Sequence, residues 1–79
     1  MASITSDQIR AARALLRLSV IDLSEGSGVG IATIKRIEAA SGVPPAHART
    51  LDQLEKAFAD LGVEFIGTPD DRPGVRLKK

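Results

Sequence analysis

The stretch from residue 19 to residue 38 limits the possible fold more than any other part of the chain. It holds two short segments of helical character, and a glycine-containing break separates them. Ser19 has the side-chain oxygen that caps a helix, so the first helix is predicted from residue 20 to about 25, and Gly28 is the expected left-handed position in the break. The second helix is predicted from about Ile31 to Ala40. Two helices joined in this way pack at a steep angle, so that the second projects from the body of the domain.

Two longer helices are predicted on either side of this stretch. The first begins at a Ser6 cap and runs to about Arg17. Its apolar residues recur at helical spacing, at Ile9, Ala12 and Leu16. The other runs from Ala48 or Thr50 to Leu61 and is the most clearly amphipathic segment of the chain.

After Gly62 the pattern changes to the alternation of a strand, over Val63–Ile66 and more briefly over Val75–Leu77. We therefore predict an all-α fold class, with a compact four-helix domain over residues 1–62 and a short C-terminal β-strand or hairpin extension over residues 63–79. A lone two-stranded ribbon is marginal in water. The strands are thus expected either to pair with a second copy of the chain or to fold as a hairpin over the helices.

Charge is distributed unevenly along the chain, although the formal net charge is only +1. Residues 1–50 and residues 68–79 are net basic, whereas residues 51–67 are net acidic. Contacts with phosphates come from clustered cations rather than from the mean charge. A nucleic acid is therefore expected to meet the first fifty residues, and the tail is a second candidate.

Residue types needed for catalysis or metal binding are scarce. The sequence has no cysteine and one histidine, and the Gly26–Gly30 cluster lacks the preceding strand and the lysine of a phosphate-cradling loop. We therefore expect neither an enzyme nor a bound cofactor or metal. No apolar run approaches the roughly 20 residues that cross a bilayer, and the layout of a signal peptide is missing, so a soluble cytoplasmic protein is expected.

The helix-break-helix stretch also matches a known pattern. The matching positions are Leu18-Ser19, Leu23, Ser27-Gly28-Val29, Thr33-Ile34 and Arg36-Ile37-Glu38. Through them the sequence resembles the Cro/C1-type, or XRE-like, helix-turn-helix family of bacterial and phage repressors, over roughly residues 4–62. The resemblance implies a lambda-repressor-like domain that binds double-stranded DNA and regulates transcription, with a repressor expected.

By this resemblance, the groove-facing set comprises Ile31, Ala32, Thr33, Lys35 and Arg36. Ser19, His47 and Arg49 complete the expected DNA-binding site. Arg36 is the first candidate for base recognition, because its fork can bind guanine O6 and N7 together; the alternative is a surface ion pair with Glu38. Lys35 and Thr33 suit phosphates.

The remaining members of the site have weaker expected roles. Ser19 could present helix-terminal amides to a phosphate, although capping alone explains this residue equally well. His47 and Arg49 could add backbone contacts, and the alternative for His47 is a solvated loop residue.

Two departures from the family pattern bear on how DNA would be read. Val20 stands where glutamine commonly meets a phosphate, and Gly30, Ile31 and Ala32 stand where polar residues commonly begin the second helix of the motif. Apolar contact with thymine methyl groups is the readout left to Ile31 and Ala32. Alternatively, Ile31 packs on its own domain or at a protein interface.

The resemblance also implies contacts that hold the protein together. In the family, an arginine at the position of Arg13 typically pairs with the acid that ends the second helix of the motif, here Glu38, as a fold-holding ion pair. Regulators of this type usually bind as two-fold dimers, and residues 63–79 are the expected dimerisation element. The rival interpretation is a protein-binding or antitoxin-like module that uses apolar residues such as Val20 and Ile21 against another protein.

Overall fold

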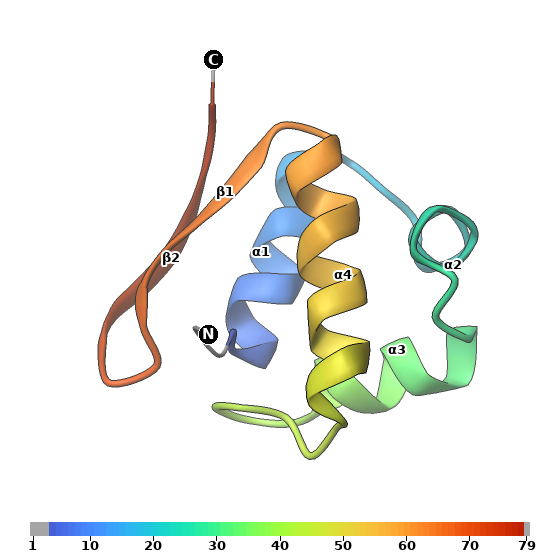
Figure 1. The fold of residues 1–79 in the computed structure, drawn as a ribbon, viewed down its shortest axis with the longest axis horizontal. Helices are drawn as coiled ribbons and strands as arrows, with labels where there is room; N and C mark the ends of the chain where they lie inside the picture. Colours follow the sequence, from blue (N-terminus) through green and yellow to red (C-terminus); the bar gives the residue numbers. More distant parts are fainter. Residues whose placement is uncertain (1–3, 79) are drawn as a thin grey trace.

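Four helices and one hairpin follow each other in the computed structural model, which describes residues 4–78 (Figure 1). The helices are α1 (Ser6–Leu15), α2 (Val20–Ser27), α3 (Ile31–Ala39) and α4 (Ala48–Asp60), and the strands are β1 (Val63–Thr68) and β2 (Asp71–Leu77). The helix bounds agree with the predicted segments to within two residues, whereas β2 begins four residues earlier than expected. None of the described helices has the length and apolar character to cross a membrane.

The predicted all-α fold class is wrong, because β1 and β2 form an antiparallel sheet that completes the core. Alternate side chains of a strand point to the same face, which turns Val63 and Phe65 towards the helices. Val63 is 1% exposed, and the ring of Phe65 lies 5.8 Å from the ring of Phe58 in α4. The fold is therefore mixed, and of the two arrangements expected for the tail the structure has the intrachain hairpin.

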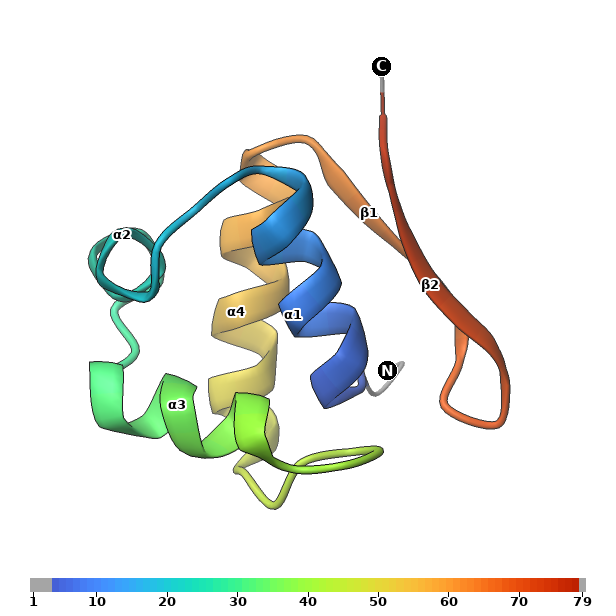
Figure 2. The same ribbon diagram turned by 180° about the vertical axis from the view of Figure 1, so that it is seen from behind.

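The hairpin lies against the ends of the chain's two long helices. β1 packs on α4 and β2 packs on α1 (Figure 2). Its register pairs Val63 with Leu77 and Phe65 with Val75, and a bulge follows Ile66. In both views α3 lies on the side of α1 and α4 away from the hairpin. This arrangement leaves α3 uncovered by the tail.

One apolar core joins the helices and the sheet. Its fully buried large side chains come from the segment before α1, from every helix and from β1, and they are Ile4, Ile9, Leu23, Ile34, Ile37, Leu54, Phe58 and Val63. Burying side chains of this size stabilises the fold by about 1.5–3 kcal/mol each. Ile4 precedes the first helix, where helical spacing gives no signal of burial.

The cap of the first helix is Thr5 rather than the predicted Ser6, so α1 starts one residue earlier than expected. The Thr5 hydroxyl accepts from the Gln8 amide at 3.1 Å, and Gln8 Oε1 accepts from the Thr5 amide at 2.8 Å, which forms a capping box. Ser6 is buried instead, and its hydroxyl donates to the Ile37 carbonyl at 2.7 Å. Both neighbours can cap a helix, but only Thr5 has a glutamine three residues later, which completes the capping box.

Gln8 also ties the hairpin to α1. Its side-chain Nε2 donates to the Ile66 carbonyl at 3.0 Å and to the Gly74 carbonyl at 2.9 Å. The same buried amide group thus satisfies one helix amide and two strand carbonyls. These bonds fix the far end of the hairpin against the start of α1.

The turn between α2 and α3 has the geometry expected for a sharp change of direction. The Ser19 hydroxyl caps α2 by accepting from the Asp22 amide at 2.9 Å, as predicted. Gly28 ends α2 with φ of 78°, a left-handed conformation that glycine adopts without steric cost. Figure 1 shows α2 nearly end-on while α3 lies across the view, so the two helices cross steeply.

Candidate nucleic-acid interface

Helix α3 has one face in the core and one face at the surface. Ile34, Ile37 and Glu38 are buried. Ile31, Ala32, Lys35 and Arg36 are exposed, and Thr33 is half-buried. Five of the predicted site residues therefore lie on one helix, four of them on its exposed face.

The start of α3 has an apolar surface. Ile31 is 40% exposed although it is a large hydrophobic residue, and Ala32 beside it is exposed as well. Gly30 precedes them at the N-cap and makes no side-chain capping bond. The first turn of α3 therefore presents no side-chain hydrogen-bonding group before Thr33. Ile31 packs in part on its own domain and keeps the rest of its side chain at the surface.

Arg36 lies one helical turn after Ala32 and is free of acidic partners. Its Nη2 donates to the Thr33 hydroxyl at 3.4 Å, a long bond between exposed groups. Glu38, the alternative partner considered for Arg36, bonds to Arg13 instead. The Arg36 guanidinium therefore keeps most of its donors for a ligand.

The ion pair between Arg13 and Glu38 is present and holds α1 to α3. Arg13 Nε and Nη2 each donate to a Glu38 carboxylate oxygen at 2.9 Å, and Arg13 Nη1 donates to the Leu18 carbonyl at 3.1 Å. The Glu38 side chain is 10% exposed and that of Arg13 is 29% exposed. The side-chain hydrogen bond with Glu38 is the main cause that raises the pKa of Arg13 above its ordinary value; desolvation opposes it, and the charge of Glu38 adds a smaller upward effect. Glu38 is thus a structural residue.

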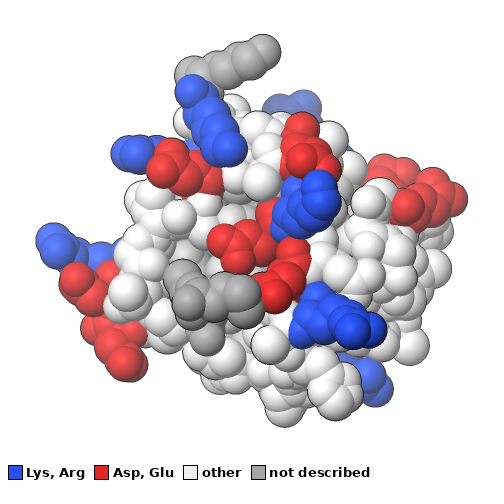
Figure 3. All heavy atoms as spheres, viewed as in Figure 1, with Lys and Arg blue, Asp and Glu red and all other residues white. Residues whose placement is uncertain are grey.

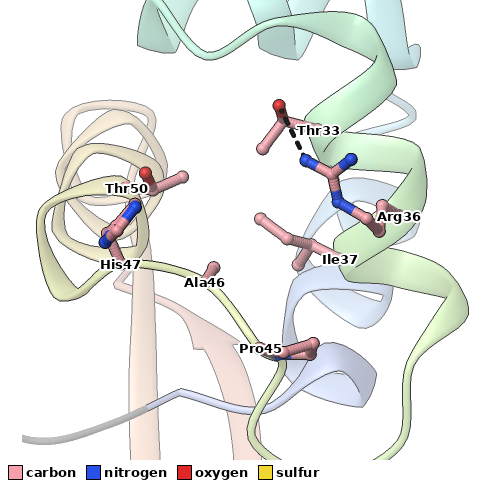
Figure 4. A pocket seen from close by; sticks show the side chains of 7 residues that line it. All are labelled: Thr33, Arg36, Ile37, Pro45, Ala46, His47 and Thr50. Carbon is pink, nitrogen blue, oxygen red and sulfur yellow. Dashed lines mark hydrogen bonds between the residues drawn. The ribbon is translucent and has the colours of Figure 1, made fainter.

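A groove separates the outer end of α3 from the start of α4 (Figure 4). It has a volume of about 690 Å³. Its lining residues are Thr33, Arg36, Ile37, Pro45, Ala46, His47 and Thr50. Figure 4 shows the side chains of Thr33 and Arg36 on one wall and those of His47 and Thr50 on the other. The structure therefore brings three predicted site residues, Thr33, Arg36 and His47, around one cavity.

His47 is the N-cap of α4 and makes no side-chain capping bond. Helices leave their first amides without intrahelical partners, and such amides suit anions. Thr50 adds a hydroxyl to this wall of the groove and was missed in the sequence. Its spacing of three residues from His47, which places both on one helix face, was the signal that could have found it.

Five predicted site residues do not line the groove, and three of them, Ile31, Ala32 and Lys35, lie on the exposed face of α3. Arg49 is exposed in the first turn of α4, next to His47. Ser19 is exposed at the start of α2, and its hydroxyl is used for capping. Ser19 thus has a structural explanation of its own.

Within residues 4–78, the cations on α3 and at the start of α4 form no ion pair, and the same is true of Arg17 and Lys78. On α4 and the hairpin, Lys56, Arg72 and Arg76 each pair with an acid. In this described part of the chain, the unpaired cations on α3 and at the start of α4 are Lys35, Arg36 and Arg49. In Figure 3 acidic side chains gather over the middle and end of α4, with a basic one among them, and over α2, whereas only basic side chains lie at the lower right, over α3 and the start of α4; other basic side chains lie at the upper left and left. The positive charge at this end is free to attract a polyanion.

The described residues contain no group of three or more His, Cys, Asp or Glu side chains that could hold a metal ion. No protein-family model matches the chain, and no curated protein matches it in sequence.

Proposed function

We propose that this protein is a sequence-specific double-stranded DNA-binding protein of the Cro/C1-type helix-turn-helix family and acts as a small transcriptional regulator, in the first instance a repressor. In this proposal α3 enters the major groove, whose width of about 12 Å admits a helix. Arg36 reads a base, and Lys35 contacts the DNA backbone. The observation that carries the proposal is the exposed face of α3, with unpaired cations and no cover from the hairpin.

The groove between α3 and α4 supports this proposal by its chemistry. Two hydroxyls, a guanidinium and an imidazole converge on it from two helices. Hydroxyls and cationic donors of this kind contact DNA phosphates and fix the register of a protein on the duplex. We assign the groove to one backbone phosphate next to the bases that α3 reads.

Salt dependence of binding tests the proposal. We expect affinity for duplex DNA to fall steeply with salt, because each neutralised phosphate releases counterions. The double substitution Lys35→Ala and Arg36→Ala should weaken binding and reduce the slope of log K against log salt by about 1, because Lys35 contacts a phosphate whereas Arg36 reads a base. Fluorescence anisotropy with a labelled duplex measures both quantities.

The matched control removes two cations outside the proposed interface. Lys56→Ala with Arg72→Ala changes the net charge equally but affects α4 and the hairpin, so affinity and slope should stay close to those of the wild type. Equal losses in the two double variants would mean that the protein attracts DNA only through its net charge. The site assignment would then be wrong.

A protein-binding or antitoxin-like module is the second candidate, and one observation favours it. Ile21 on α2 is 57% exposed, and an apolar cleft of about 130 Å³ lies nearby between α2 and α4, lined in part by Leu18, Leu23 and Leu61. An apolar interface loses little affinity as salt rises. Salt-insensitive binding to a protein, with no binding to duplex DNA, would favour this candidate.

A further inference from the structure

The surface of α3 divides into an apolar start and a cationic second turn. Ile31 and Ala32 are exposed in the first turn. Lys35 lies four residues after Ile31, and Arg36 lies four residues after Ala32. Residues at this spacing lie above one another on a helix face, about 6 Å apart along the axis. The exposed face thus has a carbon-only end and a charged end.

We infer that this protein recognises the 5-methyl group of a thymine through Ile31 and Ala32, about two base-pair steps from a guanine bound by Arg36. This inference rests on the proposed function. Thymine offers the one apolar group on the base edges of the major groove. Any other base edge against Ile31 would lose water without gaining a hydrogen bond, which penalises the wrong base.

The spacing follows from the helix geometry. Successive bases on one strand are about 3.4 Å apart, so a rise of about 6 Å along α3 corresponds to roughly two steps. The hydroxyl of Thr33 holds one nitrogen of Arg36 and leaves the rest of its fork for guanine O6 and N7. The two contacts together define a short DNA sequence, with a guanine at one end and, at the other, a thymine whose methyl group is needed for full affinity.

Removal of single methyl groups from the DNA tests this inference. The probe is the duplex that the full-length protein binds most tightly after selection from a random pool. Each thymine is then replaced in turn by deoxyuridine, which lacks the methyl group. We expect one position at which binding weakens about fourfold, the factor for one methyl-sized group leaving an apolar contact. A cytosine at that position should bind more weakly than 5-methylcytosine.

The protein variants show which residue reads the methyl group. Ile31→Ser should abolish the difference between thymine and deoxyuridine. Ile21→Ser is the matched control, because it also removes an exposed isoleucine but lies on α2, and it should keep that difference. Thermal unfolding of both variants verifies that the fold is retained.

The outcomes separate this inference from the function on which it rests. Salt-dependent binding to a selected duplex without any methyl-sensitive position leaves the DNA-binding function intact and overturns the inference. Methyl sensitivity that persists in Ile31→Ser overturns the assignment to Ile31, and persistence in Ile31→Ser with Ala32→Ser overturns the assignment to the start of α3. A protein that selects no duplex overturns both.

Discussion

Single charged residues divide into those that hold the fold and those that stay free at the surface. Arg13 makes three hydrogen bonds within the protein, two of them with Glu38. Arg36 makes one long bond to a neutral hydroxyl. Both are arginines on helices, and the difference lies in the acid that each one reaches. The structural role of Arg13 and the binding role proposed for Arg36 follow from that difference.

Removing Glu38 should destabilise the protein strongly. Glu38→Ala leaves Arg13 without its partner in a mostly buried position, and a fully buried pair broken in this way costs about 3–5 kcal/mol. Because Arg13 retains some access to water, we expect a loss of about 2–3 kcal/mol in the free energy of unfolding, measured with urea. The exposed pair Lys56–Asp60 is the control, and Lys56→Ala should cost about 0.5 kcal/mol or less. Similar losses in the two variants would contradict the structural role of Glu38.

Glu64 is predicted to titrate at a lower pH than an ordinary glutamate. A side-chain hydrogen bond from Arg76, and then its charge, lower the pKa of Glu64 below its ordinary value of 4.5. A carboxylate with a lowered folded-state pKa stabilises the fold above the unfolded-state pKa, and that contribution is lost as the pH falls through the folded-state pKa. NMR titration should give a midpoint below 4.5 for Glu64 in the wild type and a higher one in Arg76→Ala. Identical midpoints would show that the pair does not form in solution.

At the scale of elements, the α2–turn–α3 unit depends on one glycine. A side chain added at Gly28 would meet only Gln53, at an ordinary contact distance of 3.7 Å, so the cost of substitution is conformational. A non-glycine residue in the left-handed region loses about 1–2 kcal/mol. We expect Gly28→Ala to lower the free energy of unfolding by that amount, without a change in the denaturant slope.

Gly26→Ala is the control for this prediction. Gly26 lies inside α2, and a side chain there would meet nothing within 4 Å. Alanine is a better helix former than glycine by about 1 kcal/mol, so this variant should be at least as stable as the wild type. A Gly28→Ala protein of unchanged stability would show that the turn is not held in the left-handed conformation.

Local sequence patterns predicted the helices. The features that they failed to predict depend on contacts between residues far apart in the chain. Gly28, the Ser19 cap and the apolar spacing of the α4 segment are signals within one element, and each lies where it was expected. The bonds from Gln8 to Ile66 and Gly74 span about sixty residues, and no periodicity reports them. The all-α class was wrong for the same reason, because only the packed structure shows that Val63 belongs to the core.

The candidate site was predicted in part by the same logic. The family resemblance named Ile31, Lys35 and Arg36, and helical spacing is enough to place them on the exposed face of α3. The groove needs α4 to approach α3, and this approach depends on the loop through Pro45 and Ala46. Thr50 became a candidate with that geometry, although its spacing from His47 already placed both residues on one helix face.

At the scale of the whole molecule, the hairpin and the exposed face of α3 form two separate surfaces. The hairpin and α3 lie on different sides of α1 and α4, and acidic side chains cover much of α4 (Figures 1 and 3). The longest dimension of the chain is 30 Å. Recognition helices of a two-fold dimer lie about 34–36 Å apart on DNA, so two copies of this size side by side would span adjacent half-sites.

We predict that the protein forms a dimer through its hairpin. Each strand has one hydrogen-bonded neighbour, which leaves an unpaired edge on both, and Leu77 of β2 is 47% exposed. Sedimentation equilibrium should give twice the chain mass of 8.3 kDa for the wild type and the single mass for Leu77→Lys. Ile21→Lys introduces the same charge on α2 and should remain dimeric. A wild-type protein that sediments as a monomer at every concentration would rule out this role of the hairpin.

The central claim is that the exposed face of α3 is the surface that meets DNA. NMR amide shifts recorded during titration with the selected duplex test it most directly, because they report every element at once. We predict that the changes concentrate in residues 30–36 and 46–50, with small changes over β1 and over the acidic middle of α4. Changes confined to the hairpin, or to α2 and its apolar cleft, would contradict the claim.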